Sequence, residues 1–152
     1  MDKTRWLLLI TRDMRLYMPP ELFWSRQAAD FEARRWLWFL YGLTRVSDKR
    51  LAGGEVKVGV RNVLHLVEVD MPESWGRSMR LWACLAMNED SYPKVAVDLI
   101  SGDVSEGHAW VLQHARKQEA PSESFGAEWC YELTFHRRGV KHYAAAHRVK
   151  SS

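Results

Sequence analysis

Two histidine and cysteine pairs in the last third of the chain have the residue types of a zinc site. Five residues separate His108 from His114, and five separate Cys130 from His136. Imidazole nitrogens and thiolate sulfurs are ligands that Zn²⁺ prefers in proteins, and four of them complete a tetrahedral structural site. The pattern therefore predicts one zinc ion bound by these four side chains.

The spacing within each pair also supports a metal-free alternative. Residues 129–135 alternate between two sets of side chains, which is typical of a β-strand with one buried face. On a straight strand Cys130 and His136 would lie about 20 Å apart, at about 3.3 Å per residue, so the chain would have to bend for one ion to bind both. The alternative is a hairpin that packs the following side chains on one face: Trp129, Tyr131, Leu133 and Phe135.

Signatures of common enzyme active sites are absent from the sequence. No glycine-rich phosphate loop follows a predicted strand, and neither a Gly-x-Ser-x-Gly elbow nor a His-Glu-x-x-His motif occurs. Glu55 and Lys57 resemble half of a nuclease site but lack a clearly placed upstream metal-binding acid. We therefore expect a protein that binds other macromolecules without catalysis. A small enzyme that uses two of the late histidines as acid and base is a separate class of function.

The elements that would position these side chains are mostly strands. The segments that we interpret as strands are Arg5 to Thr11, Val56 to Val60, Val63 to Val69, Ser78 to Met87, Lys94 to Ile100 and residues 129–135. Glu119 to Gly126 is expected to be a polar loop, while Ala109 to Lys117 fits either a helix or a strand. The sequence predicts an α+β fold, with a mostly antiparallel sheet, one principal helix packed on it and a smaller C-terminal segment.

The principal helix allows two interpretations. Residues 19–21, Pro-Pro-Glu, predict a helix start, and apolar residues recur at helical spacing up to an end near Gly42. The other interpretation is a shorter helix, about residues 20–33, followed by a strand through Trp36, Trp38 and Leu40. The crowding of aromatic side chains favours this second interpretation.

The last segment, Val140 to Val149, also allows two interpretations. The three consecutive alanines at 144–146 favour a helix, in which Val140, Tyr143, Ala144 and His147 would share one face. The other interpretation is a strand, joined by a turn at 137–139 to residues 129–135. A helix here would be available to bind a partner, whereas a strand would continue the sheet.

Composition bounds the class of protein. The 152 residues, 47% of them apolar, predict a single domain, in which we distinguish an α+β core at 1–105 and a zinc-like, partner-docking subregion at 106–152. The apolar runs are too short to span a membrane, the first residues do not form a signal peptide, and two cysteines are too few for a disulfide framework. We expect a cytoplasmic or nuclear protein. Eight tryptophans and a basic C-terminal segment that has no acidic residue after Glu132 favour binding surfaces.

Several segments resemble lentiviral Vif, the viral infectivity factor. The opening Arg5-Trp6 to Ile10 is similar to the first strand of that family, and Ala33-Arg34-Arg35-Trp36 resembles its Ala-Arg-Gly-Trp segment. Residues 55–60 and 64–67 match its next two strands in order and pattern, and residues 73–75 leading to 81–82 match its tryptophan-bracketed strand. The four predicted zinc ligands fall where the family has its own, with His114 in place of a cysteine. The resemblance covers residues 1–90 as a pattern and 108–149 more loosely.

The resemblance implies a non-enzymatic viral accessory adaptor that binds host APOBEC-family cytidine deaminases and recruits them to a cullin–RING ubiquitin ligase. It implies that the deaminase and RNA contact N-terminal basic and aromatic residues, for which the candidates are Arg12, Arg15, Arg34, Arg35, Trp36, Trp38, Lys49 and Arg50. It implies that an elongin-type ligase component docks on the segment that carries Val140, Tyr143, Ala144 and His147, although the family's Ser-Leu-Gln sequence is not present there. The alternative function is a small basic module that binds RNA or single-stranded DNA.

Overall fold

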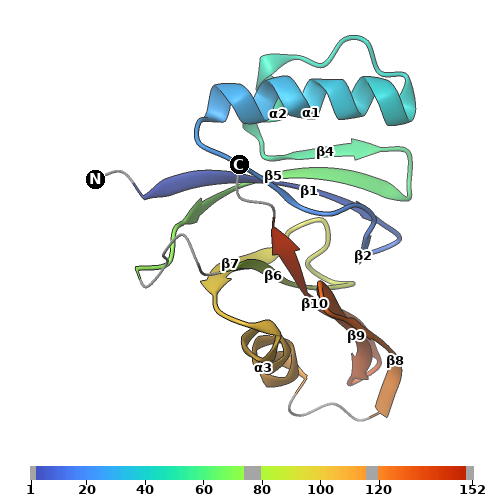
Figure 1. Ribbon diagram of the computed structural model, residues 1–152. Coiled ribbons are helices and arrows are strands. Elements are labelled where there is room, and N and C mark those ends of the chain that lie inside the picture. The colour runs from blue at the N-terminus through green and yellow to red at the C-terminus, as the bar shows by residue number, and fades with distance from the viewer. Residues whose placement is uncertain (1–2, 74–79, 116–119, 150–152) are drawn as a thin grey trace.

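The chain folds into four layers. The computed structural model describes residues 3–73, 80–115 and 120–149. From top to bottom, Figure 1 shows the principal helix, a first sheet, a second sheet and a further helix. Within the described residues each sheet has five strands, and every pairing is antiparallel. The predicted α+β class is confirmed, with two sheets in place of the one that we expected.

The first sheet is built from the first half of the chain. Its strands are β1 (Thr4–Arg12), β2 (Arg15–Leu16), β3 (Glu21–Phe23), β4 (Glu55–Val58) and β5 (Asn62–Asp70). They follow the order β2-β1-β5-β4, and β3 also pairs with β1. Successive side chains of β1 enter opposite cores: Leu7 and Leu9 face the second sheet, while Leu8 and Ile10 face the helix above. Because both faces are covered, the middle of β1, residues 6–10, is apolar without interruption.

The second sheet combines segments that are far apart in the sequence. Its strands are β6 (Leu81–Asn88), β7 (Ala96–Ser101), β8 (Ala120–Ala127), β9 (Cys130–Arg137) and β10 (Val140–Val149), in the order β7-β6-β10-β9-β8. The central pair joins β6 to β10, so the boundary that we drew at residue 105 runs through the middle of this sheet. The layers divide instead in the segment between β5 and β6.

The principal helix α1 spans Arg26–Tyr41 and covers the outer face of the first sheet. Ser25 caps it, since its Oγ accepts a hydrogen bond from the backbone N–H of Ala28, and Gly42 ends it with a φ of 68°. The interpretation of residues 36–40 as a strand is therefore wrong. The interpretation as one longer helix is confirmed at its end near Gly42 but is wrong at its start, because residues 21–23 form β3.

Two further helices are short. α2 (Asp48–Ala52) follows the loop after α1, and α3 (Val104–His114) lies on the outer face of the second sheet. Asp103 caps α3 by accepting from the N–H of Ser105, which settles residues 109–114 as helix. Among the described residues, no helix has both the length and the apolar composition needed to cross a bilayer.

Two expectations for the last third of the chain are corrected. Residues 140–149 form the strand β10, so their interpretation as a docking helix is wrong and the hairpin alternative is confirmed. The expected polar loop at 119–126 is largely the edge strand β8. Residues 78, 117 and 119, which bounded three of the predicted elements, lie outside the described residues. An edge strand has a free side towards solvent, which allows the polar sequence that suggested a loop.

Candidate functional site

The outer face of α1 carries an exposed row of large aromatic side chains. Ala29, Ala33 and Leu37 are buried against the first sheet, so the helical period turns the opposite side of α1 to solvent. On that side Phe31, Trp38 and Phe39 are 66%, 60% and 72% exposed. A helix that only covered a core would carry polar residues there. The outer face of α1 is therefore the candidate functional site.

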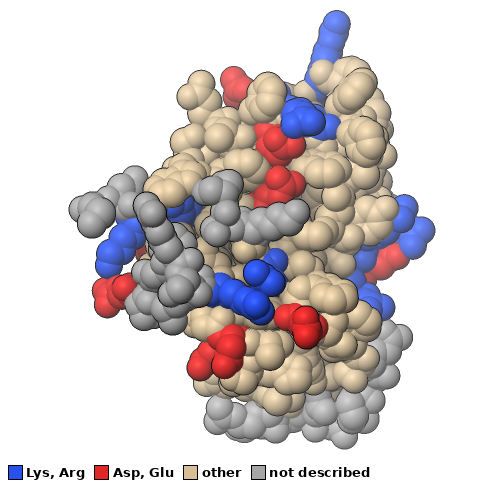
Figure 2. Space-filling view, in the orientation of Figure 1, with Lys and Arg blue, Asp and Glu red and all other residues tan. Residues whose placement is uncertain are grey.

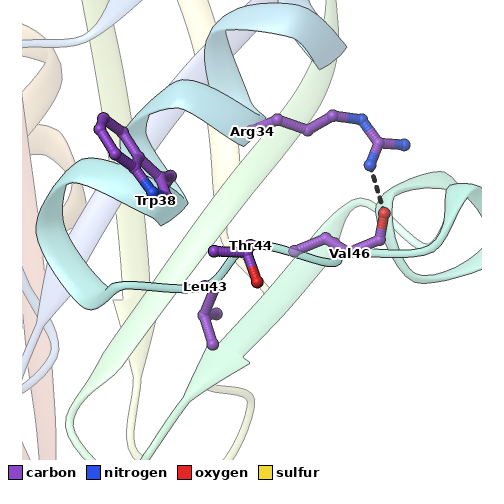
Figure 3. Close-up of a pocket in the computed structure, with 5 residues that line it drawn as sticks. All are labelled: Arg34, Trp38, Leu43, Thr44 and Val46. Carbon is purple, nitrogen blue, oxygen red and sulfur yellow. Dashed lines mark hydrogen bonds between the residues drawn. The ribbon is translucent and has the colours of Figure 1, made fainter.

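Two arginines beside these rings are held in place by hydrogen bonds. Arg35 is one turn from Phe31 and from Phe39, and its guanidinium donates to both carboxylate oxygens of Glu32, at 3.1 and 3.2 Å. Arg34 donates to the carbonyl oxygen of Val46, as Figure 3 shows, and forms an ion pair with Asp48. Arg34 therefore fixes the loop after α1 against the helix.

Trp38 separates two shallow hollows. The first, of about 300 Å³, lies between α1 and the loop that follows it (Figure 3) and is lined by Arg34, Trp38, Leu43, Thr44 and Val46. The second, of about 200 Å³, is lined by Glu32, Arg35, Trp36, Trp38 and Phe39. Trp36 forms one side wall of the second hollow, since its ring meets Phe39 edge to face at 6.0 Å and its Nε1–H donates to Glu21. Four of the eight predicted target-binding residues thus lie together.

The other four predicted target-binding residues are not part of this face. Arg12 lies 5.1 Å from the ring of Tyr17, and Arg15 forms an ion pair with Glu132 of the second sheet. Lys49 and Arg50 lie on α2, where Arg50 donates to the carbonyl oxygen of Lys57. Charged side chains of both signs are interspersed on the face seen in Figure 2, whose upper part is mostly uncharged.

The four residues predicted to dock on a ligase do not form a surface. Tyr143 and Ala144 are 1% exposed, and because they are neighbours on β10 they enter different cores. The Tyr143 hydroxyl donates to Glu132 and accepts from the N–H of Leu16, and burial raises its pKa. Val140 and His147 lie near opposite ends of the strand, only half-buried. A partner could reach Tyr143 only if the sheet opened.

The four predicted zinc ligands do not converge. Cys130 and His136 lie near opposite ends of β9, where they pair with His147 and Lys141 of β10 in an uninterrupted register. The His108 ring packs on Tyr131 at 3.8 Å, and His114 stacks on Trp110 at 3.9 Å. Burial raises the pKa of Cys130 to about 12. Within the described part of the chain, no three His, Cys, Asp or Glu side chains are grouped as metal ligands would be.

Sequence reasoning missed two features. Phe31 and Phe39 were not singled out, although their offset from Ala29, Ala33 and Leu37 around a helix would have placed them outside once the helix was assigned. The second feature is a polar cluster between the two sheets, where fully buried His65 and Thr11 are joined by a 2.8 Å hydrogen bond and Tyr92 bonds to the same hydroxyl. The signal for this cluster was a lone histidine within the otherwise apolar run of residues 63–67.

Comparison of the chain with models of known protein families, with curated proteins and with solved structures finds no match. The class of binding surface therefore has to be argued from the geometry of the outer face of α1 and from the chemistry of its side chains.

Proposed function

We propose that this chain is a non-catalytic adaptor that binds a protein partner on the outer face of α1. The observation that carries the proposal is the exposure of Phe31, Trp38 and Phe39 around Arg35 on one side of a rigidly capped helix. Tryptophan, tyrosine and arginine dominate the binding energy of protein interfaces, and exposed apolar surface on a helix commonly fills the groove of a partner. Trp38, with a hollow on each side, is the central anchor.

The charges around the face favour a protein over a nucleic acid. Residues 25–54 contain six basic side chains (Arg26, Arg34, Arg35, Arg45, Lys49 and Arg50) and three acidic ones (Asp30, Glu32 and Asp48), a net charge of +3. The two arginines nearest the aromatic rings are already paired with carboxylates, Glu32 and Asp48. Phosphates would have to displace those carboxylates, whereas an apolar groove would accept the exposed aromatic rings as they stand.

The resemblance to lentiviral Vif supplies a candidate partner. It implies a host APOBEC-family cytidine deaminase, bound for transfer to a cullin–RING ubiquitin ligase. The deaminase half of this proposal is supported by the grouping of Arg34, Arg35, Trp36 and Trp38. The ligase half rests on the resemblance alone, because the segment that was expected to dock on the ligase is the central strand β10.

The test is capture of APOBEC-family deaminases, co-expressed one at a time, by the wild-type chain and by Trp38→Ala. Truncation of a central aromatic anchor costs about 2 kcal/mol or more, which lowers affinity by about 30-fold or more. Trp129→Ala is the matched control, since Trp129 is 54% exposed and lies on the turn between β8 and β9. Both variants should keep the wild-type melting temperature.

A deaminase that binds the wild type and the Trp129 variant but not the Trp38 variant would support the proposal. Equal capture by all three chains would refute the assignment of the face. Binding that depends on co-purified RNA, is abolished by nuclease and falls steeply with salt would refute a protein partner and favour the nucleic-acid alternative.

A further inference from the structure

Another hollow lies at one end of the second sheet. It opens where the turn after β6 meets the β9–β10 hairpin, and it consists of two adjoining parts of about 400 and 520 Å³. Four residues line both parts: Asn88, Ser91, Arg137 and His142. These volumes lie in the range of sites that bind small molecules.

The wall of this hollow contains an arginine that forms no ion pair with any described residue. Arg137 is half-buried and forms no ion pair with a carboxylate among the described residues. Its Nη2 donates to the carbonyl oxygen of His114 at 3.0 Å, while its Nε is buried without a hydrogen-bond partner. A guanidinium that has lost part of its hydration is stabilised by an anion in contact with it, and no described carboxylate forms an ion pair with Arg137.

The rest of the lining is also positively charged. Lys94 and Arg138 are the other basic residues, and Asp90 is the single carboxylate among the lining residues that the structure describes. Lys94 is exposed and forms no ion pair with any described residue. Lys94 and Arg137 therefore face a single described carboxylate of the lining, Asp90, which leaves an excess of one positive charge before either histidine is counted. A negatively charged ligand would balance this excess.

The backbone of the turn beside the cations is held by hydrogen bonds. Asn88 Oδ1 accepts hydrogen bonds from the backbone N–H groups of Asp90 and Ser91, at 2.9 and 3.0 Å. This bond pair holds the turn in the conformation that places Ser91 and Lys94 in the lining. The backbone of this turn therefore requires little ordering when a ligand binds, so little affinity is lost to its entropy.

One wall of the hollow is flat and aromatic. The His142 ring stacks on buried Phe135, with centroids 5.0 Å apart and planes 10° apart, and Arg137 lies 5.5 Å from the same phenyl ring. Met87, Val95 and Val140 add apolar surface to the lining. A planar ring joined to an anionic group would match both halves of the hollow, because bases stack on aromatic and histidine rings.

We propose that this hollow binds a mononucleotide, with its phosphate between Lys94 and Arg137 and its base against the His142 ring. A phosphate monoester carries close to two negative charges at neutral pH and accepts several hydrogen bonds, and arginine matches its oxygens in pairs. The site uses neither α1 nor the aromatic face, so it is independent of the proposed binding of a protein partner.

The test is titration of the whole chain with adenosine monophosphate, inorganic phosphate and adenosine at constant ionic strength set by sodium chloride. Calorimetry gives the affinity, and the ring resonances of His142 report where the ligand lies. We expect adenosine monophosphate to bind with a Kd on the order of 1 mM or tighter, and phosphate and adenosine each to bind more weakly. Lys94→Ala should weaken binding of the nucleotide by about fivefold or more, and Arg137→Met should abolish it.

Lys57→Ala is the control, since Lys57 is an exposed cation on β4 of the first sheet and should leave binding unchanged. Because Lys94 is exposed, its variant should fold even if the Arg137 variant does not. No heat and no change at His142 with about 10 mM nucleotide or phosphate would overturn the proposal. Unchanged affinity of the Lys94 variant would also overturn it, and equal affinity for phosphate and nucleotide would overturn the assignment of the base.

Discussion

The buried His65 should make the protein sensitive to mild acid. Its side chain is 0% exposed, its Nε2 shares a hydrogen bond with the Thr11 hydroxyl, and its Nδ1 is buried without a partner. Burial lowers the pKa of His65 from 6.5 to about 4, because the charged imidazolium would lose its hydration. Between these two pH values the unfolded chain binds a proton at His65 that the folded chain does not bind. Stability from this group is therefore complete above about pH 6.5 and is lost as the pH falls towards 4.

The magnitude follows from the shift in pKa. At about 1.36 kcal/mol per unit, full protonation costs about 3 kcal/mol, of which about 2 kcal/mol is lost between pH 7 and pH 5. The assay is urea denaturation at both pH values for the wild type and for His65→Leu, which fills the site with an apolar side chain that does not titrate. Thr11 keeps its hydrogen bond to Tyr92 in this variant. The variant should lose about 2 kcal/mol less than the wild type over this interval.

The difference between the two chains cancels the contribution of every other group that titrates. Burial also lowers the pKa of His142, so the His142→Gln variant in the same assay measures how much of the total loss comes from that residue. If the wild type and the His65 variant lose the same free energy of unfolding between pH 7 and pH 5, His65 titrates as it does in the unfolded chain. In that case the buried position of its ring would be wrong.

Two further predictions concern the second sheet and α3. Because Cys130 and His136 are separated by the length of a strand, we expect metal analysis of protein purified without chelator to find less than one zinc per chain. The Cys130→Ser variant should bind as much zinc as the wild type. Stoichiometric zinc that is lost in this variant would mean that β9 bends in solution. A Cβ atom at Gly107 would lie 3.0 Å from the Cβ of Ala146, so Gly107→Ala should lower stability by about 1–2 kcal/mol despite the higher helix propensity of alanine. Calorimetry that finds the variant more stable would contradict this close approach of α3 to β10.

The sequence was sufficient for the fold class and for most strand positions. The period-2 pattern at 129–135 corresponds to β9, and the strand predicted at 63–69 corresponds to β5. The segment from Trp36 to Leu40 was misassigned because aromatic residues were assumed to lie inside. Three aromatic side chains of α1 are exposed, so the inward spacing of smaller residues was the better guide to its period.

The segment 140–149 shows how tertiary packing overrides local propensity. Ala144 and Ala146 face α3, and Ala145 faces the first sheet, so small side chains allow close approach on both sides of the central strand. Three alanines in a row favour a helix only when no sheet is available. The pairing of β10 with β6 joins residues that are about 60 positions apart, and a local pattern contains no information about such a contact.

The candidate sites depended on the fold to different degrees. Arg34, Arg35, Trp36 and Trp38 are close in sequence, so any helix would have kept them together. The hollow that we propose to bind a mononucleotide is lined by both Lys94, between β6 and β7, and Arg137, at the end of β9. The sequence alone could not have indicated that these two residues meet.

The four-layer arrangement separates the proposed binding face from the residues that keep the protein folded. The first sheet lies between α1 and the core that joins the two sheets. Phe31, Trp38 and Phe39 belong to neither core, whereas Ala29 and Leu37 seal the one beneath the helix. Substitutions on the outer side of α1 can therefore accumulate with little loss of stability, so the chemistry of this face can change while the architecture stays the same.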